Sequence, residues 1–251
     1  MSLTGNLSFS LPSFIYAVLY AVFILSCQWF YTAAMKSGGV SICSIVFSMG
    51  FIFPTVSGMI FWDEPISALK IIGIITVIPT IILSGLSKND GEGEPEKRGG
   101  GEISFIIPLL IAMLASGALG ILQKVHQMSE YSEERTMMIL VAFVLASIIS
   151  FVFALFAKPE EKSDGDTGSS DLKRKLLFSV GIGICYGSCN LLNTVLAGML
   201  ESAVFFPLLN VSMILLSLLL SIIFFKEKFT KRHLIILLLG ILSIILVNVN
   251  F

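Results

Sequence analysis

Eight apolar runs of about 20 residues each cover most of this 251-residue chain. A run of that length is long enough to cross a lipid bilayer as one helix. Helices are favoured over strands, because a helix satisfies its backbone hydrogen bonds within itself, whereas a membrane barrel shows short segments of alternating polarity. The sequence therefore predicts an all-α, multi-pass transmembrane bundle of about eight helices.

Composition supports a membrane environment, since 55% of the residues are hydrophobic, only 13% are charged, and the mean hydropathy is +0.93. Two hydrophilic stretches, 88–102 and 158–175, predict flexible loops outside the membrane. The predicted helices run over Ser13–Met35, Val40–Trp62, Ile66–Leu86, Ile103–Gln127, Thr136–Ala157, Leu176–Met199, Ser202–Phe225 and His233–Val249.

Basic residues are distributed unevenly between the two sides that these helices define. One side holds Lys70, Lys124 and Arg135, while the remaining 13 of the 16 Lys and Arg residues fall on the other side. The positive-inside rule would place the richer side in the cytoplasm and both termini outside.

A short phrase occurs twice, each time between two long apolar runs. Phe61-Trp62-Asp63-Glu64 returns as Phe224-Phe225-Lys226-Glu227, a shift of 163 residues between Glu64 and Glu227. This shift equates helices one to three with helices six to eight and leaves helices four and five without an upstream counterpart. Such duplication is typical of transporters built from two related bundles.

The duplication predicts an incomplete three-plus-five arrangement. Residues 13–86 would form a first repeat of three helices, 87–102 a hydrophilic linker, and 103–250 a second repeat of five helices. Two helices are absent at the amino end relative to a five-plus-five inverted repeat. A natural variant, a truncated product and a misplaced start codon are all open explanations.

Several segments resemble the drug/metabolite transporter superfamily, in particular its EamA-type members. The matching residues include 44–47, 61–64 and 72–73, then Gly120-Ile121-Leu122-Gln123-Lys124, and finally 225–230 leading to Gly240. The resemblance implies a transporter of small metabolites or drugs that works by alternating access around a central cavity. It also implies that both termini face the cytoplasm, which conflicts with the charge distribution and leaves the orientation open.

Polar side chains on two equivalent helices are the candidate substrate-binding residues. The sixth helix carries Tyr186, Asn190 and Asn193 at steps of four and three residues, which form one stripe, and the first helix offers Tyr20, Gln28 and Tyr31. Polar groups inside a membrane must face protein or water. They would line a shared cavity, or alternatively form hydrogen bonds that only hold neighbouring helices together.

The fourth helix places Ala112, Ser116, Gly120 and Lys124 on one face at four-residue steps. Small residues in this pattern predict close helix packing, and the same interpretation applies to Gly183 and Gly187. Lys124 lies near the helix end, where its long side chain would extend to the lipid headgroups or bind an anionic group.

Glu64 and Glu227 each precede a hydroxyl residue by three positions, since Ser67 and Thr230 follow them. Ser and Thr are favoured helix N-caps, and a nearby carboxylate suits the positive end of a helix. Helix capping therefore explains the repeated phrase, and a gating or ion-coupling role for the two carboxylates is the alternative.

The remaining chemistry of the sequence argues against an enzyme, a cofactor and a nucleic-acid partner. All four cysteines fall within predicted spans, where small apolar packing is the expected use, and the only two histidines lie near helix ends. We predict no catalytic residue, metal or cofactor. The predicted partners are the lipid bilayer of a cell membrane, a small-molecule substrate, and a homo- or hetero-oligomer. The alternative function is a non-transporting membrane subunit or an inactive remnant.

Overall fold

The computed structural model describes residues 9–38, 43, 46–65, 67–87, 105–156, 169–225 and 231–248. This part of the chain is helical and contains no strand, as the apolar runs predict. The elements are α1 (Leu11–Gly38), η1 (Met49–Phe51), α3 (Ile52–Phe61), α4 (Ala68–Ser87), α5 (Ile106–Met128), η3 (Ser132–Glu134), α6 (Arg135–Phe156), α7 (Ser169–Met199), α8 (Ser202–Phe225) and α9 (Lys231–Asn248).

The eight predicted helices correspond to the eight α-helices, with two differences. Helix α7 begins at Ser169, so residues 169–175 are helical although the sequence predicts a loop there. The sequence signal for a membrane helix is apolarity, and this polar first part of α7 does not carry it.

The second predicted helix is not one uniform α-helix, because a 3-10 helix, η1, directly precedes α3. Pro54 has no backbone N–H, and its ring disfavours an ordinary α-helical turn before it. At this junction Gly50 lies against α5, since an added Cβ atom would be 2.9 Å from the backbone oxygen of Met113. The change from 3-10 to α-helix therefore lies at a close contact between the two segments.

Among the described residues, four helical segments are long and apolar enough to cross a membrane, at Leu11–Lys36, Ile106–Met128, Ser132–Phe156 and Leu177–Met199. Four shorter apolar helices lie at Val46–Phe61, Ala68–Leu83, Ser202–Leu216 and Leu234–Leu246. Many large apolar side chains of these segments are exposed, which is expected where lipid covers the protein surface.

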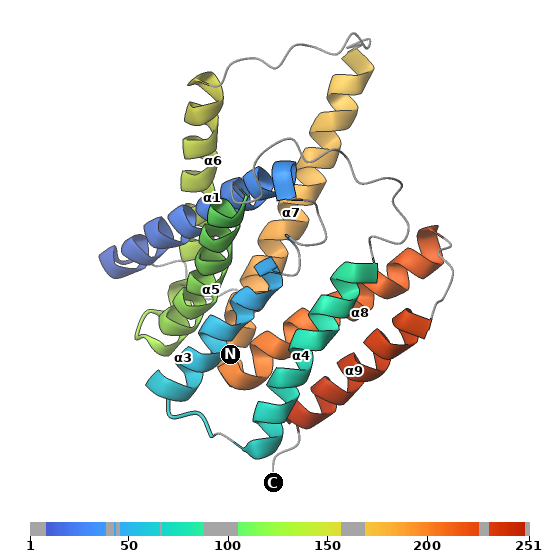
Figure 1. Ribbon diagram of the computed structural model, residues 1–251. Coiled ribbons are helices and arrows are strands. Elements are labelled where there is room, and N and C mark those ends of the chain that lie inside the picture. The colour runs from blue at the N-terminus through green and yellow to red at the C-terminus, as the bar shows by residue number, and fades with distance from the viewer. Residues whose placement is uncertain are drawn as a thin grey trace.

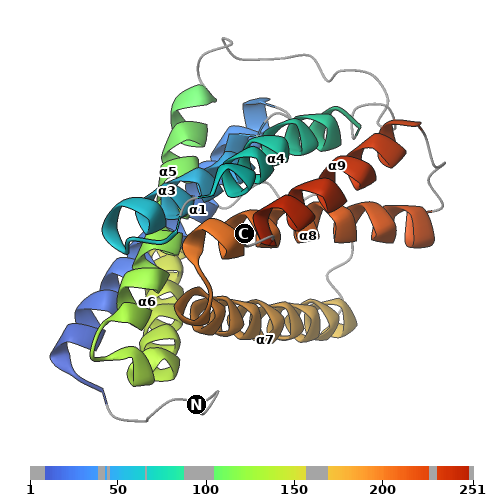
Figure 2. The ribbon, with the colours of Figure 1, turned by 90° about the horizontal axis from the view of Figure 1, so that it is seen from below.

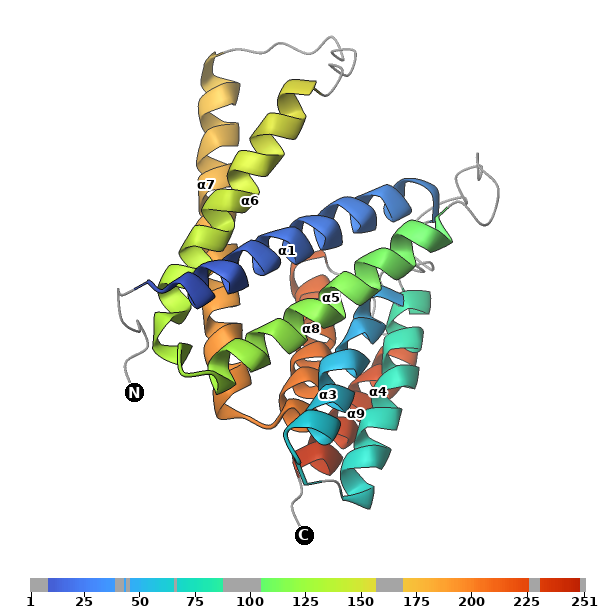
Figure 3. The same ribbon diagram turned by 90° about the vertical axis from the view of Figure 1, so that its left-hand side faces the viewer.

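The bundle has two main packed regions. Helix α1 lies against α5 and α6, and Ala17, Tyr20 and Met138 are fully buried there. Helices α3, α4, α8 and α9 form the second region (Figure 1; Figure 2 shows α8 and α9 side by side). One end of α6 and one end of α7 extend beyond α1, as Figure 3 shows.

Two of the three helix pairs that the shift of 163 residues equates pack on each other. Helix α3 packs on α8, and α4 packs on α9. Ser243 of α9 donates a hydrogen bond to the backbone oxygen of Gly73 on α4 at 2.8 Å. The predicted repeat therefore relates α3 to α8 and α4 to α9, which are in contact, and α1 to α7, which are not a main packed pair of the described residues.

The small residues of α5 mediate close packing, as the sequence predicts. A Cβ atom at Gly120 would lie 2.9 Å from Pro54 and 3.0 Å from Phe206. The same prediction is wrong for α7, because a Cβ atom at Gly183 or Gly187 would meet nothing within 4 Å. The two glycine pairs look alike in sequence, and only their surroundings distinguish them.

We expect Gly120→Ala to destabilise the protein by about 1–3 kcal/mol, because the added methyl group must displace Pro54 or Phe206. Gly181→Ala is the matched control, since its methyl group would enter open space and alanine favours a helix. Thermal unfolding of the purified variants in lipid nanodiscs measures the difference. Equal unfolding temperatures for the two variants would contradict the packing argument.

Candidate substrate site and ion-pair cluster

Side chains from three helices meet around the hydroxyl group of Tyr20. This hydroxyl group donates a hydrogen bond to Oδ1 of Asn190 at 2.7 Å and accepts one from Nε2 of Gln123 at 3.1 Å. Tyr20 lies on α1, Gln123 on α5 and Asn190 on α7. Tyr20 is fully buried, so its hydroxyl group depends on these two partners.

A second hydrogen bond links α1 to α7 nearby. Gln28 donates through Nε2 to the hydroxyl group of Tyr186 at 3.0 Å, and Asn190 donates through Nδ2 to the backbone oxygen of Tyr186 at 2.9 Å. We call Tyr20, Gln28, Gln123, Tyr186 and Asn190 the polar cluster. Its side chains are phenols and carboxamides and carry no formal charge.

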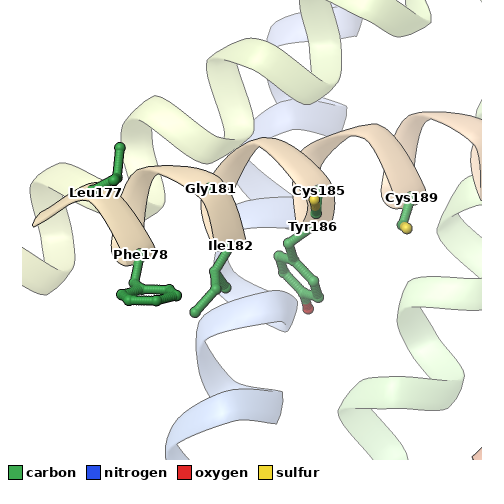
Figure 4. Close-up of a pocket in the computed structure, with 7 residues that line it drawn as sticks. All are labelled: Leu177, Phe178, Gly181, Ile182, Cys185, Tyr186 and Cys189. Carbon is green, nitrogen blue, oxygen red and sulfur yellow. The ribbon is translucent and has the colours of Figure 1, made fainter. Parts of the chain in front are cut away.

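Tyr186 also borders an open groove of about 510 Å³ along α7. Figure 4 shows Phe178, Ile182 and Tyr186 extending from the same side of this helix. The other lining residues named there are Leu177, Gly181, Cys185 and Cys189. The polar cluster thus adjoins an apolar surface through one side chain, Tyr186.

Two of the six predicted substrate-binding residues on α1 and α7 lie outside the polar cluster. The ring of Tyr31 packs against Phe47, with a centroid distance of 4.5 Å. Asn193 is half-buried on α7 and makes none of the hydrogen bonds of the cluster. The structure brings together Tyr20, Gln28, Tyr186 and Asn190 from the six candidates on these two helices.

The carboxylate of Glu64 caps a helix, but not the helix that follows it in the sequence. Its Oε1 accepts a hydrogen bond from the backbone N–H of Ser202 at 2.7 Å, and its Oε2 accepts one from Ala203 at 3.0 Å. These N–H groups form the first turn of α8. Glu64 therefore satisfies unpaired donors and places negative charge at the positive end of that helix.

The end of α3 directs Glu64 toward α8. Asp63 adopts a left-handed conformation with φ of 48°, and the backbone N–H of Glu64 donates to the oxygen of Gly58 at 3.5 Å. Gly58 has no side chain in the way, since a Cβ atom would lie 2.5 Å from both Oε2 of Glu64 and Cβ of Ser202. The turn and the glycine together allow this close approach.

The start of α4 uses the predicted N-cap, Ser67. Its hydroxyl oxygen accepts a hydrogen bond from the backbone N–H of Lys70 at 3.2 Å. Capping of α4 therefore needs no contribution from Glu64. The equivalent carboxylate, Glu227, lies outside the described residues, and its predicted role stays a prediction.

Lys124 is buried and paired, so the prediction that its side chain extends to the headgroups is wrong. Its Nζ lies 3.1 Å from Oε1 of Glu64 and donates to the backbone oxygen of Leu200 at 2.8 Å. Only 2% of Lys124 is exposed. The anionic group that Lys124 contacts is thus a carboxylate of the protein itself, which the sequence position near a helix end could not reveal.

A second buried lysine pairs with an acidic residue in the same region. Lys70 of α4 donates through Nζ to Oε2 of Glu201, which lies between α7 and α8, and to the backbone oxygen of Pro65 at 3.2 Å. We call Glu64, Lys70, Lys124 and Glu201 the ion-pair cluster. Each of its two pairs joins the first predicted repeat to the second. The acidic residue belongs to the first repeat in the Glu64–Lys124 pair and to the second repeat in the Lys70–Glu201 pair.

Burial raises the pKa of the Glu64 carboxyl group, but the hydrogen bonds from Ser202 and Ala203 and the charge of Lys124 outweigh burial and lower it below 4.5. The folded state is therefore stabilised above pH 4.5, and this stabilisation is lost as the pH falls through the lowered pKa.

We expect the thermal unfolding temperature to fall below pH 4.5, and to fall less steeply in Glu64→Gln, which has no carboxyl group to titrate at this position. Unfolding of both proteins is measured in nanodiscs of uncharged lipid between about pH 3 and pH 7, a range that extends to both sides of pH 4.5. Parallel curves for the two proteins would contradict the role of Glu64.

The four cysteines are free and differ in exposure. Cys27 and Cys43 are buried, as packing predicts, whereas Cys185 and Cys189 are exposed, so the packing prediction is wrong for this pair. Among the described residues no group of three or more His, Cys, Asp or Glu side chains is arranged to hold a metal ion.

Sequence reasoning missed Gln123, Lys70 and Glu201 as members of these clusters. The signal for Gln123 was present, because an amide within an apolar helix needs a hydrogen-bond partner. No comparable signal exists for Lys70 and Glu201. They are 131 residues apart, and only the fold brings their side chains together.

The model of the EamA-like transporter family matches residues 103–249, more than half of the chain. The chain belongs to this family. The match covers α5 to α9, whose helices supply Gln123 and Asn190 to the polar cluster and Lys124 to the ion-pair cluster. Membership and the apolar helices identify a membrane protein of the drug/metabolite transporter kind.

A solved crystal structure of another protein has the same fold, with a TM-score of 0.68. The alignment covers 96% of this chain and 79% of the other, at 14% sequence identity. About a fifth of that longer chain thus has no counterpart in this EamA-family protein. No curated protein matches the chain.

Proposed function

We propose that this EamA-family protein is a multi-pass transporter of a cell membrane that moves small uncharged metabolites or drugs by alternating access. Residues 13–86 and 103–250 act as its two repeats. One observation carries the proposal: the hydroxyl group of Tyr20, from the first repeat, bonds to Gln123 and Asn190 of the second. A solute that binds beside the hydroxyl group of Tyr20 would contact both repeats.

The chemistry of the polar cluster supports an uncharged substrate. Phenol and carboxamide groups donate and accept hydrogen bonds but cannot neutralise an ion. A charged group in the apolar part of a membrane requires a partner of opposite charge. The carboxylates and lysines of the ion-pair cluster already pair with one another, so we assign them to gating rather than to substrate binding.

The ion-pair cluster supports a closed state at one end of the bundle. Lys124 joins α5 to the end of α3, and Lys70 joins the start of α4 to the connection before α8. Movement of one repeat against the other at this end must separate these pairs. Glu201 is the more exposed partner, with 36% of its side chain accessible, so the Lys70–Glu201 pair is the one we expect to open.

The test is uptake into lipid vesicles that contain the purified chain. Vesicles are loaded with an unlabelled neutral amino-acid amide or nucleoside. Exchange for the same compound in radiolabelled form outside the vesicles is then followed at about pH 7 without an ion gradient. Protein-dependent exchange of a neutral compound supports the proposal. If only permanently charged compounds exchange, the assignment of an uncharged substrate is wrong, and if none exchanges, the chain is a non-transporting subunit.

A further inference from the structure

His126 is the buried ionisable side chain of α5 that belongs to neither the polar cluster nor the ion-pair cluster. None of its surface is exposed, and its ring packs edge-on against Tyr16 of α1 with a centroid distance of 5.2 Å. Tyr16 lies four residues before Tyr20, and His126 lies three residues after Gln123. The ring contact is therefore one helical turn from the hydrogen bond between Tyr20 and Gln123, in the same interface between α1 and α5.

The surroundings of the His126 ring indicate its protonation state. Nε2 of Gln127 lies 3.1 Å from Nδ1 of His126, and an amide nitrogen is a donor, so Nδ1 accepts and carries no proton. The single proton of the neutral ring is then on Nε2. This Nε2 atom has no hydrogen-bond partner among the residues that the structure describes. The structure therefore contains a neutral ring in a site that satisfies only one of its two nitrogens.

A second proton does not fit the ring in this arrangement. A proton on Nδ1 would face the amide N–H of Gln127, so two donors would meet. Gln127 is packed against α7, since a Cβ atom at Gly198 would lie 2.7 Å from its Cβ and 3.0 Å from its Oε1. Burial adds the cost of removing a charged ring from water. Protonation is therefore disfavoured while α1 and α5 stay in contact at this point.

The charged groups near the ring come from the connection between α5 and α6. Glu134 of η3 favours a positive charge on His126, and Arg135 at the start of α6 disfavours it. Helix α1 places Tyr16 against the ring, while η1, α3 and the last turn of α7 contain no titratable residue. On α5 itself, Lys124 is paired with its own carboxylate. Glu134 is therefore the anion that a protonated ring would attract.

The carboxylate of Glu134 also holds the start of α1. Its Oε2 accepts a hydrogen bond from the backbone N–H of Ser10 at 2.9 Å and another from Oγ of Ser10 at 2.7 Å. A positive charge on His126 would compete with Ser10 for this carboxylate. Loss of the Ser10 contacts would release the end of α1 that carries Tyr16. A proton on His126 and the contact between α1 and α5 therefore oppose each other.

We propose that His126 is a proton-binding site whose occupancy opens the interface between α1 and α5. The neutral ring belongs to the closed interface, and the protonated ring belongs to a state in which Tyr16 has moved away and water reaches the ring. The inference rests on the proposed function, which makes this opening one step of alternating access. By linkage, a proton that binds only to the open state shifts the protein toward that state at acidic pH.

The size of the shift follows from the ordinary behaviour of histidine. An exposed histidine has a pKa of about 6.5. Between about pH 7.5 and about pH 5.5, a ring that binds its proton only in the open state raises the ratio of open to closed protein about tenfold. Carboxyl groups with ordinary pKa values stay ionised over this range.

The experiment measures the distance between the ends of α1 and α5 that flank His126. Spin labels are attached to Leu11→Cys and Met128→Cys, two exposed positions, in a chain whose native cysteines are replaced by alanine. Pulsed electron paramagnetic resonance in nanodiscs of uncharged lipid then gives the distance distribution. We expect the ratio of the long-distance to the short-distance population to rise about tenfold between about pH 7.5 and about pH 5.5.

His126→Gln should abolish this rise, because an amide side chain does not titrate. His233→Gln is the matched control, since it removes the second of the two histidines and leaves His126 in place. We expect it to keep the full response. An equal response in the two variants would overturn the proposal.

A second variant tests the proposal if His126→Gln does not fold. Gln127→Met keeps a side chain of similar length but removes the N–H that faces Nδ1, so protonation becomes easier and opening should begin at a higher pH. The His233→Gln chain has a single histidine, so nitrogen NMR reports the protonation of His126 directly. An unchanged pH profile in Gln127→Met, or a ring that stays neutral while the distance changes, would contradict the proposal.

These measurements need no transported compound, so the two proposals fail separately. If a neutral solute exchanges but the distance does not respond to pH, the proton site is wrong and the proposed function stands. If the distance follows protonation of His126 but no solute exchanges, the proton site stands and its link to transport is wrong.

Discussion

Replacing Lys124 with Met is expected to destabilise the protein by about 3–5 kcal/mol, because it leaves the carboxylate of Glu64 buried without a cation. Only 8% of Glu64 is exposed, so water cannot replace the lysine fully. The backbone oxygen of Leu200 loses its hydrogen bond from Nζ as well. Unfolding by heat in nanodiscs of uncharged lipid measures the change at pH 7.

The double variant Lys124→Met with Glu64→Gln separates the charge effect from packing. A neutral amide at position 64 needs no cation, so we expect the double variant to regain part of the lost stability. Lys231→Met is the control, because Lys231 is exposed at the start of α9. If the double variant is no more stable than the single variant, the cost comes from packing and not from an unpaired carboxylate.

Replacing Asn190 with Leu is expected to lower the initial rate of solute exchange about tenfold, which corresponds to about 1.4 kcal/mol and matches the loss of one hydrogen bond. Asn190 is the α7 partner of Tyr20, at 2.7 Å. Without its Oδ1 atom, the hydroxyl group of Tyr20 loses its acceptor in the second repeat. Exchange is measured in vesicles with the neutral compound found to move fastest.

Asn210→Leu is a closely matched control for this experiment. Asn210 of α8 donates to the backbone oxygen of Phe206 four residues earlier, just as Asn190 donates to that of Tyr186. Both variants lose the same local hydrogen bond, but only Asn190→Leu breaks the contact with Tyr20. Equal exchange rates for the two variants would remove the polar cluster from the transport pathway.

The ion-pair cluster and the polar cluster are adjacent on α5. Gln123 bonds to Tyr20, and the next residue, Lys124, bonds to Glu64 and Leu200. A displacement of α5 therefore acts on both clusters, because consecutive residues of a rigid helix move together. This arrangement would connect the proposed substrate contact to the proposed gate through α5.

The sequence by itself determined the fold class and the positions of the helices. Apolar runs of about 20 residues leave the backbone no alternative to helices in lipid, so the eight helices could be predicted without any contact information. The recurrence of the Glu64 phrase at Glu227 predicts a duplication, which stays a prediction; two of the three helix pairs that it equates, α3 with α8 and α4 with α9, pack together.

Only the tertiary structure decided which side chains meet and which faces are covered. Gly120 and Gly183 have the same spacing pattern, yet an added Cβ atom would lie 2.9 Å from Pro54 at Gly120 and would meet nothing within 4 Å at Gly183. Glu64 precedes α4 but caps α8, because the left-handed turn at Asp63 redirects it. Spacing along one helix fixes a face, whereas the partner of that face depends on helices distant in the sequence.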